Sequence, residues 1–283
     1  MITKVRDLPG VGVEYDLDFN TMEKEELREF GKRIPQDNVI LVRNQNLTDE
    51  KVLEVCETFG HCMKPEQFFM HDNVPGLFRV TNERDEHGEK TGLFADKELD
   101  WHSNGNGRPS GKEACVALYC VKPGIDSVTS FCDTRRAYEE LPEDIKEIVD
   151  DVECLFKFEN NTFYELEEDD KELVIFEQHP DFVDGVNKNL VYTHPWTGEK
   201  GLYFTFHYIR EMWRKSGKPV DQEWLKDYLM KHVFQEKYIY HHDDWQPGDF
   251  VFMDQFHSIH KRNAVKGERL LYRLSFDYRR ILK

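Results

Sequence analysis

The sequence predicts a mainly β fold with flanking helices. Helical patterns concentrate in the first part of the chain, and strand patterns dominate its last third. The clearest strand spans Arg269–Tyr278, where apolar and more polar positions alternate. One face carries Leu270, Tyr272, Leu274, Phe276 and Tyr278, and the other carries Leu271, Arg273, Ser275 and Asp277. Arg273 is therefore expected to project from the more polar face of a strand whose opposite face is apolar.

Helices are predicted where capping residues precede an apolar period of 3.6. Asn20 is expected to cap a helix over Asn20–Arg33, with Glu23 three residues on as its partner. Thr48 is expected to cap a second helix, which Gly60 ends. Two further helices are predicted at Leu141–Val152 and Asp221–Val233, the second with an apolar side of Trp224, Leu225, Tyr228, Leu229 and His232.

Strands are predicted for short apolar runs that are bounded by polar residues or glycine and proline. They lie at Val39–Arg43, Leu77–Thr81, Ala114–Val121 and Phe250–Met253. The last of these follows Trp245–Asp249, whose composition is that of a turn.

Composition excludes several classes of protein. The 283 residues include 38 Lys and Arg against 55 Asp and Glu, a net charge of −17, which disfavours nucleic acid and anionic lipid as partners. We find neither an apolar run long enough for a membrane span nor a secretory signal. Six cysteines occur without a CxxC pair, so we expect reduced thiols and a cytoplasmic protein. No linker stands out, and one domain over residues 1–283 is expected.

Three places carry residues suited to chemistry. His102 lies in a polar, glycine-rich stretch, where it is either a ligand or an ordinary loop histidine. His257 and His260 follow the strand that ends near Asp254, and either is a candidate ligand or a surface residue. Arg273, on the inner face of a strand, needs an anionic partner, which is either Asp277 or the carboxylate of a ligand.

Taken together, the three places fit a metal centre. Two histidines far apart in the sequence, with a third ligand beside the first, make up the facial triad of non-haem Fe(II) oxygenases. Such a triad leaves positions open for a co-substrate and for dioxygen. An inner arginine suits a dicarboxylate that chelates the metal.

The chain resembles the taurine dioxygenase/TfdA-like family of Fe(II)/2-oxoglutarate-dependent oxygenases over nearly its whole length. The order and spacing of several segments carry this resemblance, rather than any single motif. The segments are Leu41–Glu50 with Phe59-Gly60, Glu98–His102, His194–Tyr203, Trp245–Asp249, Asp254–His260 and Arg273.

The resemblance implies a double-stranded β-helix (jelly-roll) core. It implies Fe(II) on His102 and His260, since the family's distal histidine lies six residues after an aspartate. It implies 2-oxoglutarate as co-substrate, held by Arg273 rather than Arg269 and by Thr129. The implied reaction hydroxylates an unactivated C–H bond of a small molecule with dioxygen, and releases succinate and CO2.

One position departs from the family pattern His-x-Asp, because this chain reads His102-Ser103-Asn104. Asn104 is expected to ligate the metal through its amide oxygen, a weaker donor than a carboxylate. Three alternatives stay open. Water or chloride fills the position, as halide does in related halogenases with Gly or Ala there; the chain is a non-catalytic small-molecule binder; or deamidation of Asn104, which precedes Gly105, creates the missing aspartate.

Two further expectations concern the substrate and its access. The polar loop Ser103–Ser110 suggests a small polar metabolite as substrate, with His71, Asn82, Arg84, Asn106 and Arg108 as candidate pocket residues. An insertion around residues 157–190 is a candidate lid over the site. The sequence leaves a homo-oligomer open.

Overall fold

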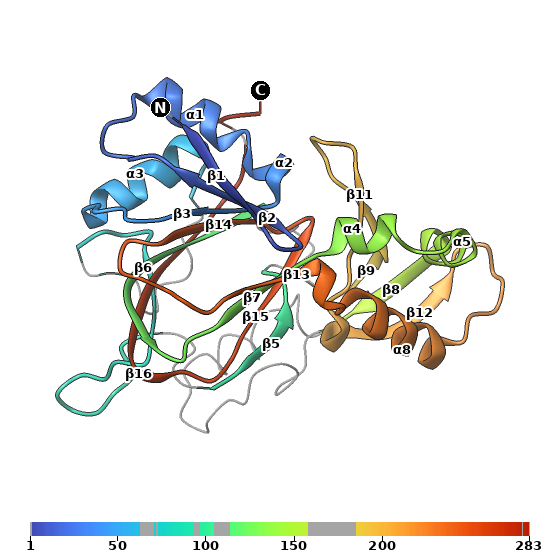
Figure 1. Cartoon of the computed structure of the whole chain (residues 1–283). Coiled ribbons are helices and arrows are strands. Elements are labelled where there is room, and N and C mark those ends of the chain that lie inside the picture. Colours follow the sequence, from blue (N-terminus) through green and yellow to red (C-terminus); the bar gives the residue numbers. More distant parts are fainter. Residues whose placement is uncertain are drawn as a thin grey trace.

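Two facing β-sheets form the centre of the molecule (Figure 1). The computed structural model describes residues 2–62, 71, 73–92, 97–104, 114–157, 185–278 and 280–282. The larger sheet has seven strands, in the spatial order β1 (Thr3–Leu8), β2 (Gly12–Asp16), β3 (Val39–Val42), β14 (Phe250–Asp254), β6 (Cys115–Ile125), β16 (Lys266–Phe276) and β4 (Phe78–Thr81). The smaller sheet has four strands, in the order β13 (Ile239–His242), β7 (Thr129–Asp133), β15 (Ser258–Arg262) and β5 (Leu99–His102). This arrangement confirms the mainly β fold and its jelly-roll core.

The space between the two sheets is filled by apolar side chains from both. They are Leu8, Val11, Val39, Leu41, Val80, Val116, Leu118, Cys120, Phe131, Tyr240, Trp245, Val251, Met253 and Leu271. Leu271 belongs to this interior cluster, whereas Leu270 and Tyr272 belong to a different cluster on the outer face of the larger sheet. Because side chains alternate along a strand, Arg269 and Arg273 share the inward face with Leu271. The predicted alternation of β16 is thus confirmed, and its more polar face is the one that lines the barrel.

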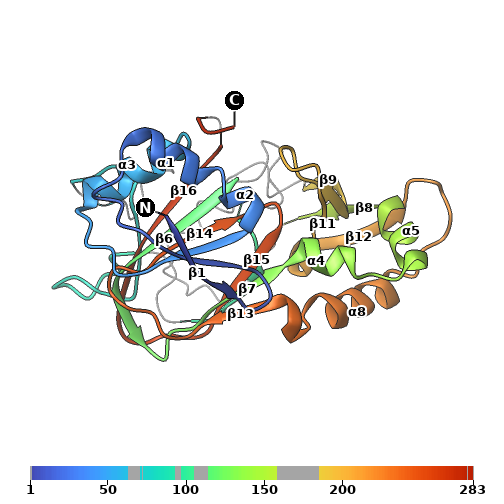
Figure 2. The same ribbon diagram turned by 45° about the horizontal axis from the view of Figure 1, so that its top comes forward.

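Helices α1 (Lys24–Gly31), α2 (Ile34–Asp37) and α3 (Asp49–Phe59) lie on the larger sheet, on the side away from the smaller one (Figures 1 and 2). The predicted cap of the first helix is wrong. Glu23, not Asn20, is its N-cap and forms a capping box with Glu26. The backbone N–H of Asn20 instead donates to Asp18, whose side chain closes a turn ahead of the helix. Thr48 caps α3 as predicted, accepting from the N–H of Lys51.

A smaller lobe stands beside the barrel, on the right in Figure 1. Its sheet has the order β12 (Ile209–Arg214), β8 (Val152–Phe156) and β9 (Val186–Asn189). Around it lie the hairpin β10 (Val191–Thr193) and β11 (Lys200–Leu202), helices α4 (Thr134–Glu139), α5 (Glu143–Asp151) and α8 (Gln222–Val233), and the 3₁₀ turns η1 (Phe206–Tyr208) and η2 (Glu236–Tyr238). Leu225 and Leu229 of α8 are buried as expected, but Trp224 is 45% exposed. The predicted apolar side of α8 is therefore narrower than its sequence indicates.

Three other expectations can be compared with the described residues. None of their helices is long and apolar enough to cross a membrane. The cysteines Cys56, Cys62, Cys115, Cys120, Cys132 and Cys154 are all free and buried. The candidate lid around 157–190 falls largely on residues 158–184, which lie outside the described residues, as do Asn106 and Arg108.

Candidate metal and co-substrate site

Two histidine rings meet inside the barrel. His102 ends β5 and lies directly opposite His260 of β15 in the antiparallel register. The ring centroids are 4.3 Å apart and the ring planes are inclined by 50°. Both residues are buried, at 6% and 9% exposure. Two imidazoles this close can ligate the same metal ion.

Burial keeps both imidazoles neutral at pH 7. It lowers the pKa of His102 to about 4, with a smaller contribution from the nearby charge of Arg273. Burial, followed by the influence of His102 and of Arg273, lowers the pKa of His260 well below its ordinary value. The Nδ1 of His102 lies 2.7 Å from the carbonyl oxygen of Asp100, so Nδ1 carries the proton and Nε2 the lone pair. A neutral imidazole is the form that binds a metal.

Asn104 follows His102 by two residues, just beyond the end of β5. Its backbone N–H donates to Oε1 of Gln255 at 2.8 Å. Its side-chain oxygen Oδ1 is buried and has no hydrogen-bond partner among the described residues, and the same is true of Nδ1 of His260. Buried acceptors are rarely left without a donor in a native protein. Two imidazoles with an amide oxygen would make a neutral donor set of a kind that fits a divalent first-row transition metal.

Strand β16 brings two arginines to the inward face, roughly 13 Å apart along the strand at about 3.3 Å per residue. Arg269 is 2% exposed, and in the part of the chain that the structure describes its Nε and Nη1 have no hydrogen-bond partner. Burial, with a smaller effect of the charge on Arg262, lowers the pKa of Arg269 to about 9. A guanidinium buried in this way, without a compensating charge, is costly unless an anion joins it.

Arg273 has different surroundings. Its Nη2 donates to Oγ of Ser275 at 3.0 Å, and its guanidinium carbon lies 5.7 Å from the ring centroid of Phe78. Its charge lowers the pKa of both His102 and His260. Arg273 is therefore the arginine near the histidine pair.

Thr129, the other residue expected to hold the co-substrate, lies opposite Arg262 in the register of β7 and β15. It is 2% exposed, and its Oγ1 accepts a hydrogen bond from the indole N–H of Trp245 at 3.3 Å. Because Arg262 also influences Arg269, Thr129 and Arg269 share a neighbour at one end of the barrel.

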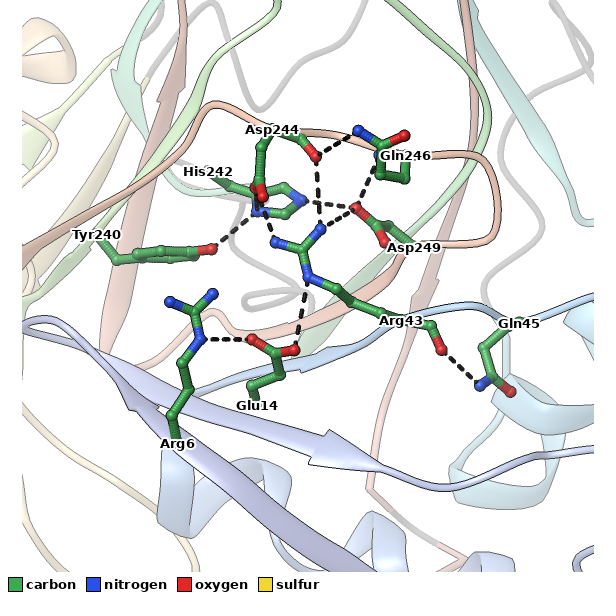
Figure 3. Close-up of polar contacts among 9 residues, drawn as sticks. All are labelled: Arg6, Glu14, Arg43, Gln45, Tyr240, His242, Asp244, Gln246 and Asp249. Carbon is green, nitrogen blue, oxygen red and sulfur yellow. Dashed lines mark hydrogen bonds and ion pairs between the residues drawn. The ribbon is translucent and has the colours of Figure 1, made fainter.

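A buried polar network adjoins this end of the barrel (Figure 3). The ring of His242 packs edge-on against Trp245 with centroids 4.3 Å apart, and its Nε2 lies 3.2 Å from Oδ2 of Asp249. Asp249 is fully buried and pairs with Arg43 at 3.1 Å. Arg43 also pairs with Asp244 at 2.7 Å. Arg43 thus offsets the charge of the buried Asp249 carboxylate, and the network stabilises the turn that carries Trp245.

A second cluster, His194, Asp254 and His257, has the composition of a metal site, with its ligand atoms within 4.8 Å of one another. Its hydrogen bonds argue against a metal. Nδ1 of His194 accepts the backbone N–H groups of Trp196 and Thr197, so its Nε2 carries the proton and donates to Asp254 at 3.1 Å. Ligation through Nε2 would require removal of that proton. His257 faces this cluster, so of the two candidate distal histidines it is His260 that meets His102.

Three of the candidate pocket residues have structural roles. His71 pairs with Asp49 at 3.0 Å, and Arg84 donates to the carbonyl of Gly88. Asn82 accepts the backbone N–H of Arg269 at 2.9 Å, so it supports strand β16.

Arg269 was considered from the sequence and set aside in favour of Arg273, although both lie on the same face of β16. Trp245 and Gln255 were not predicted as site residues, because their contacts with Thr129 and Asn104 depend on tertiary packing and leave no signal in the sequence.

Comparison with known proteins agrees with this geometry. The family model described as taurine catabolism dioxygenase TauD, TfdA family, matches residues 4–275. An alpha-ketoglutarate-dependent 2,4-dichlorophenoxyacetate dioxygenase of Cupriavidus pinatubonensis is 26% identical over 280 residues, 93% of this chain and 93% of that protein. A (S)-phenoxypropionate/alpha-ketoglutarate-dioxygenase of Sphingobium herbicidovorans is 28% identical over 230 residues, 79% of this chain and 75% of that protein.

Solved structures share the fold. A taurine dioxygenase from Burkholderia xenovorans matches with a TM-score of 0.73 and 18% identity, over 97% of this chain and 89% of that chain. AAD-2 in complex with Mn(II) and N-oxalylglycine matches with a TM-score of 0.72 and 21% identity, over 98% of this chain and 97% of that chain. Since the family model covers nearly the whole sequence, the chain belongs to the TauD/TfdA family and is an alpha-ketoglutarate-dependent dioxygenase.

Proposed function

We propose that the protein binds Fe(II) through His102, Asn104 and His260 and hydroxylates a C–H bond of a small carboxylate, with release of succinate and CO2. The observation that carries this proposal is the placement of two neutral, adjacent imidazoles in the same barrel as a buried guanidinium, two of whose nitrogens have no hydrogen-bond partner among the described residues. The first suits a metal, and the second suits the distal carboxylate of 2-oxoglutarate. Iron, when bound, supplies the activation of dioxygen, which no protein side chain provides.

Arg269, supported by Thr129, holds the distal carboxylate of 2-oxoglutarate in this proposal. Arg273 was the expected residue, but Arg269 has the stronger case. Arg269 is the more deeply buried of the two, and its Nε and Nη1 lack hydrogen-bond partners within the described ranges of the chain. A carboxylate there would form the charge-assisted pair that the buried cation needs.

Arg273 is then available to bind the substrate. It is close enough to the two histidines to lower the pKa of both. A guanidinium in that place would hold an anionic substrate beside the metal and leave its C–H bonds facing the reacting centre. The relatives named for 2,4-dichlorophenoxyacetate and (S)-phenoxypropionate act on compounds that carry a carboxylate, which supports the same class here.

Asn104 supplies the third ligand through Oδ1. The buried oxygen without a donor supports ligation over the three alternatives, because a cation would satisfy it directly. An amide in place of a carboxylate leaves the site one negative charge short, so metal affinity should be modest.

Succinate formation tests the proposal. Purified protein with Fe(II), 2-oxoglutarate and oxygen should release succinate, faster when the correct small carboxylate is added. His102→Ala should release none. A wild-type protein that folds and binds 2-oxoglutarate but yields no succinate with any member of a carboxylate library would contradict the proposed substrate class.

A further inference from the structure

The turn between β14 and β15 is held by one buried carboxylate. Oδ1 of Asp254 accepts the backbone N–H groups of Phe256 and His257 at 2.7 and 2.9 Å. Its Oδ2 accepts from Nε2 of His194 at 3.1 Å and from the hydroxyl of Tyr278 at 2.8 Å. Four donors to one carboxylate stabilise the conformation of this turn, and β15 begins directly after it.

Gln255 lies inside this turn and reaches across to the other metal-binding segment. It is fully buried, and its backbone N–H donates to the carbonyl of Ala114 at 2.9 Å. Its side-chain Oε1 accepts the backbone N–H of Asn104 at 2.8 Å. The same turn therefore leads into His260 and holds Asn104 in place.

The hydrogen bond from the backbone N–H of Asn104 to Gln255 should affect metal affinity more with an amide ligand at residue 104 than with a carboxylate ligand. A carboxylate can ligate through either of two equivalent oxygens, whereas the side chain of Asn104 has only one. A shift of its backbone would carry that oxygen away, and no equivalent atom could replace it. Fixing the backbone N–H leaves only the two side-chain torsions of Asn104 to be ordered when a metal binds.

We propose that Gln255 is a positioning residue that holds the amide oxygen of Asn104 in place for the metal. The role rests on the proposed function, because it presupposes that Asn104 is a ligand. Gln255 itself touches neither metal nor substrate in this proposal; it acts through the backbone of Asn104.

The test measures Co(II) affinity of the metal-free full-length protein by its visible absorption. Gln255→Met removes the acceptor at similar volume and should weaken Co(II) binding about tenfold, the lower end of the range for outer-shell partners of metal ligands. Gln255→Glu keeps an oxygen at Oε1 and should recover most of the affinity. In an Asn104→Ala background, Gln255→Met should have no further effect, because the residue through which it acts is gone.

Gln45→Met is the matched control. Gln45 is also buried and bridges backbone groups, accepting from Phe19 at 3.0 Å and donating to Leu17 at 2.7 Å. In the described residues it has no hydrogen bond to either metal-binding segment. It should lower the melting temperature without changing Co(II) affinity. Hydrogen exchange adds a metal-free readout, since the amide proton of Asn104 should exchange faster in Gln255→Met and at the wild-type rate in Gln45→Met.

The outcomes separate the two proposals. If Asn104→Ala weakens Co(II) binding and Gln255→Met does not, the positioning role is wrong and the ligand set stands. An equal loss from Gln255→Met in both backgrounds also overturns the role, because Gln255 would then act elsewhere. If Co(II) binding is unaffected by Asn104→Ala and by His102→Ala, the proposed metal site itself is wrong.

Discussion

The imidazole rings of His102 and His260 face each other at 4.3 Å across two neighbouring strands, although the residues are far apart in the sequence. Replacing either histidine by alanine should lower the affinity for Co(II) or Mn(II) more than about 100-fold, beyond the loss typical of outer-shell partners. Titration of the purified variants measures this. His241→Ala is the control, since His241 contacts Ser130 and Glu236 instead. Metal binding that survives both replacements would contradict the assigned ligands.

Arg269→Met should have two opposite effects. Without ligand, it removes an uncompensated buried cation and should raise the free energy of unfolding by roughly 1–3 kcal/mol. It should also weaken 2-oxoglutarate binding roughly 30-fold or more, corresponding to about 2 kcal/mol for one partner of a buried charge pair. Thermal unfolding with and without 2-oxoglutarate measures both effects.

Arg273→Met is the comparison for this experiment. It should keep the stabilisation by 2-oxoglutarate, and its main effect should be a higher KM for the carboxylate substrate. The reverse result, with 2-oxoglutarate binding lost in Arg273→Met and kept in Arg269→Met, would restore the original sequence-based assignment.

Arg43→Met should destabilise the protein by roughly 3 kcal/mol, because it leaves the fully buried Asp249 without its cation (Figure 3). Asp244→Asn removes a partner of Arg43 that is 61% exposed and should cost less than about 1 kcal/mol. Urea unfolding of the two variants tests the difference. Equal losses of unfolding free energy in the two variants would contradict the larger contribution assigned to the buried pair of Arg43 and Asp249.

Stability should fall in mild acid. Burial, opposed by the carboxylate of Asp254, lowers the pKa of His257 to about 4. Between the ordinary histidine pKa of about 6.5 and this value, the unfolded chain takes up a proton that the folded chain does not. The stability that neutral His257 contributes is therefore fully present above about pH 6.5. It is lost as the pH falls towards 4, at about 1.4 kcal/mol of unfolding free energy per pH unit.

His257→Gln isolates that contribution. Its free energy of unfolding, followed by urea titration from pH 7 to pH 4.5, should fall less steeply than that of the wild type. The buried His102 and His260 should keep part of the slope in the variant. An unchanged slope would show that His257 is not neutral in the folded protein.

The sequence alone was enough to predict the structural features that depend on local residue patterns. Thr48 caps its helix, and the period of two in β16 correctly placed Arg273 on the inward face. The exact start of α1 was not predictable, because Asn20 is the better cap by residue type, whereas the turn made by Asp18 uses Asn20 and the helix starts after Glu23.

The site was predicted only as far as its residue types and the family resemblance allowed. Which inward arginine is the more deeply buried is a tertiary property that the alternation of β16 cannot reveal. The contact between Gln255 and Asn104 likewise joins a turn to a distant strand end and leaves no periodic signal.

The most direct measurement of the central claim is the visible spectrum of the anaerobic protein with Fe(II) and 2-oxoglutarate. A metal-to-ligand absorption band should appear when both are present, and it should vanish in His260→Ala. Peptide mass spectrometry of the same sample should show unmodified Asn104. A well-folded wild-type protein that gives no band would contradict the account.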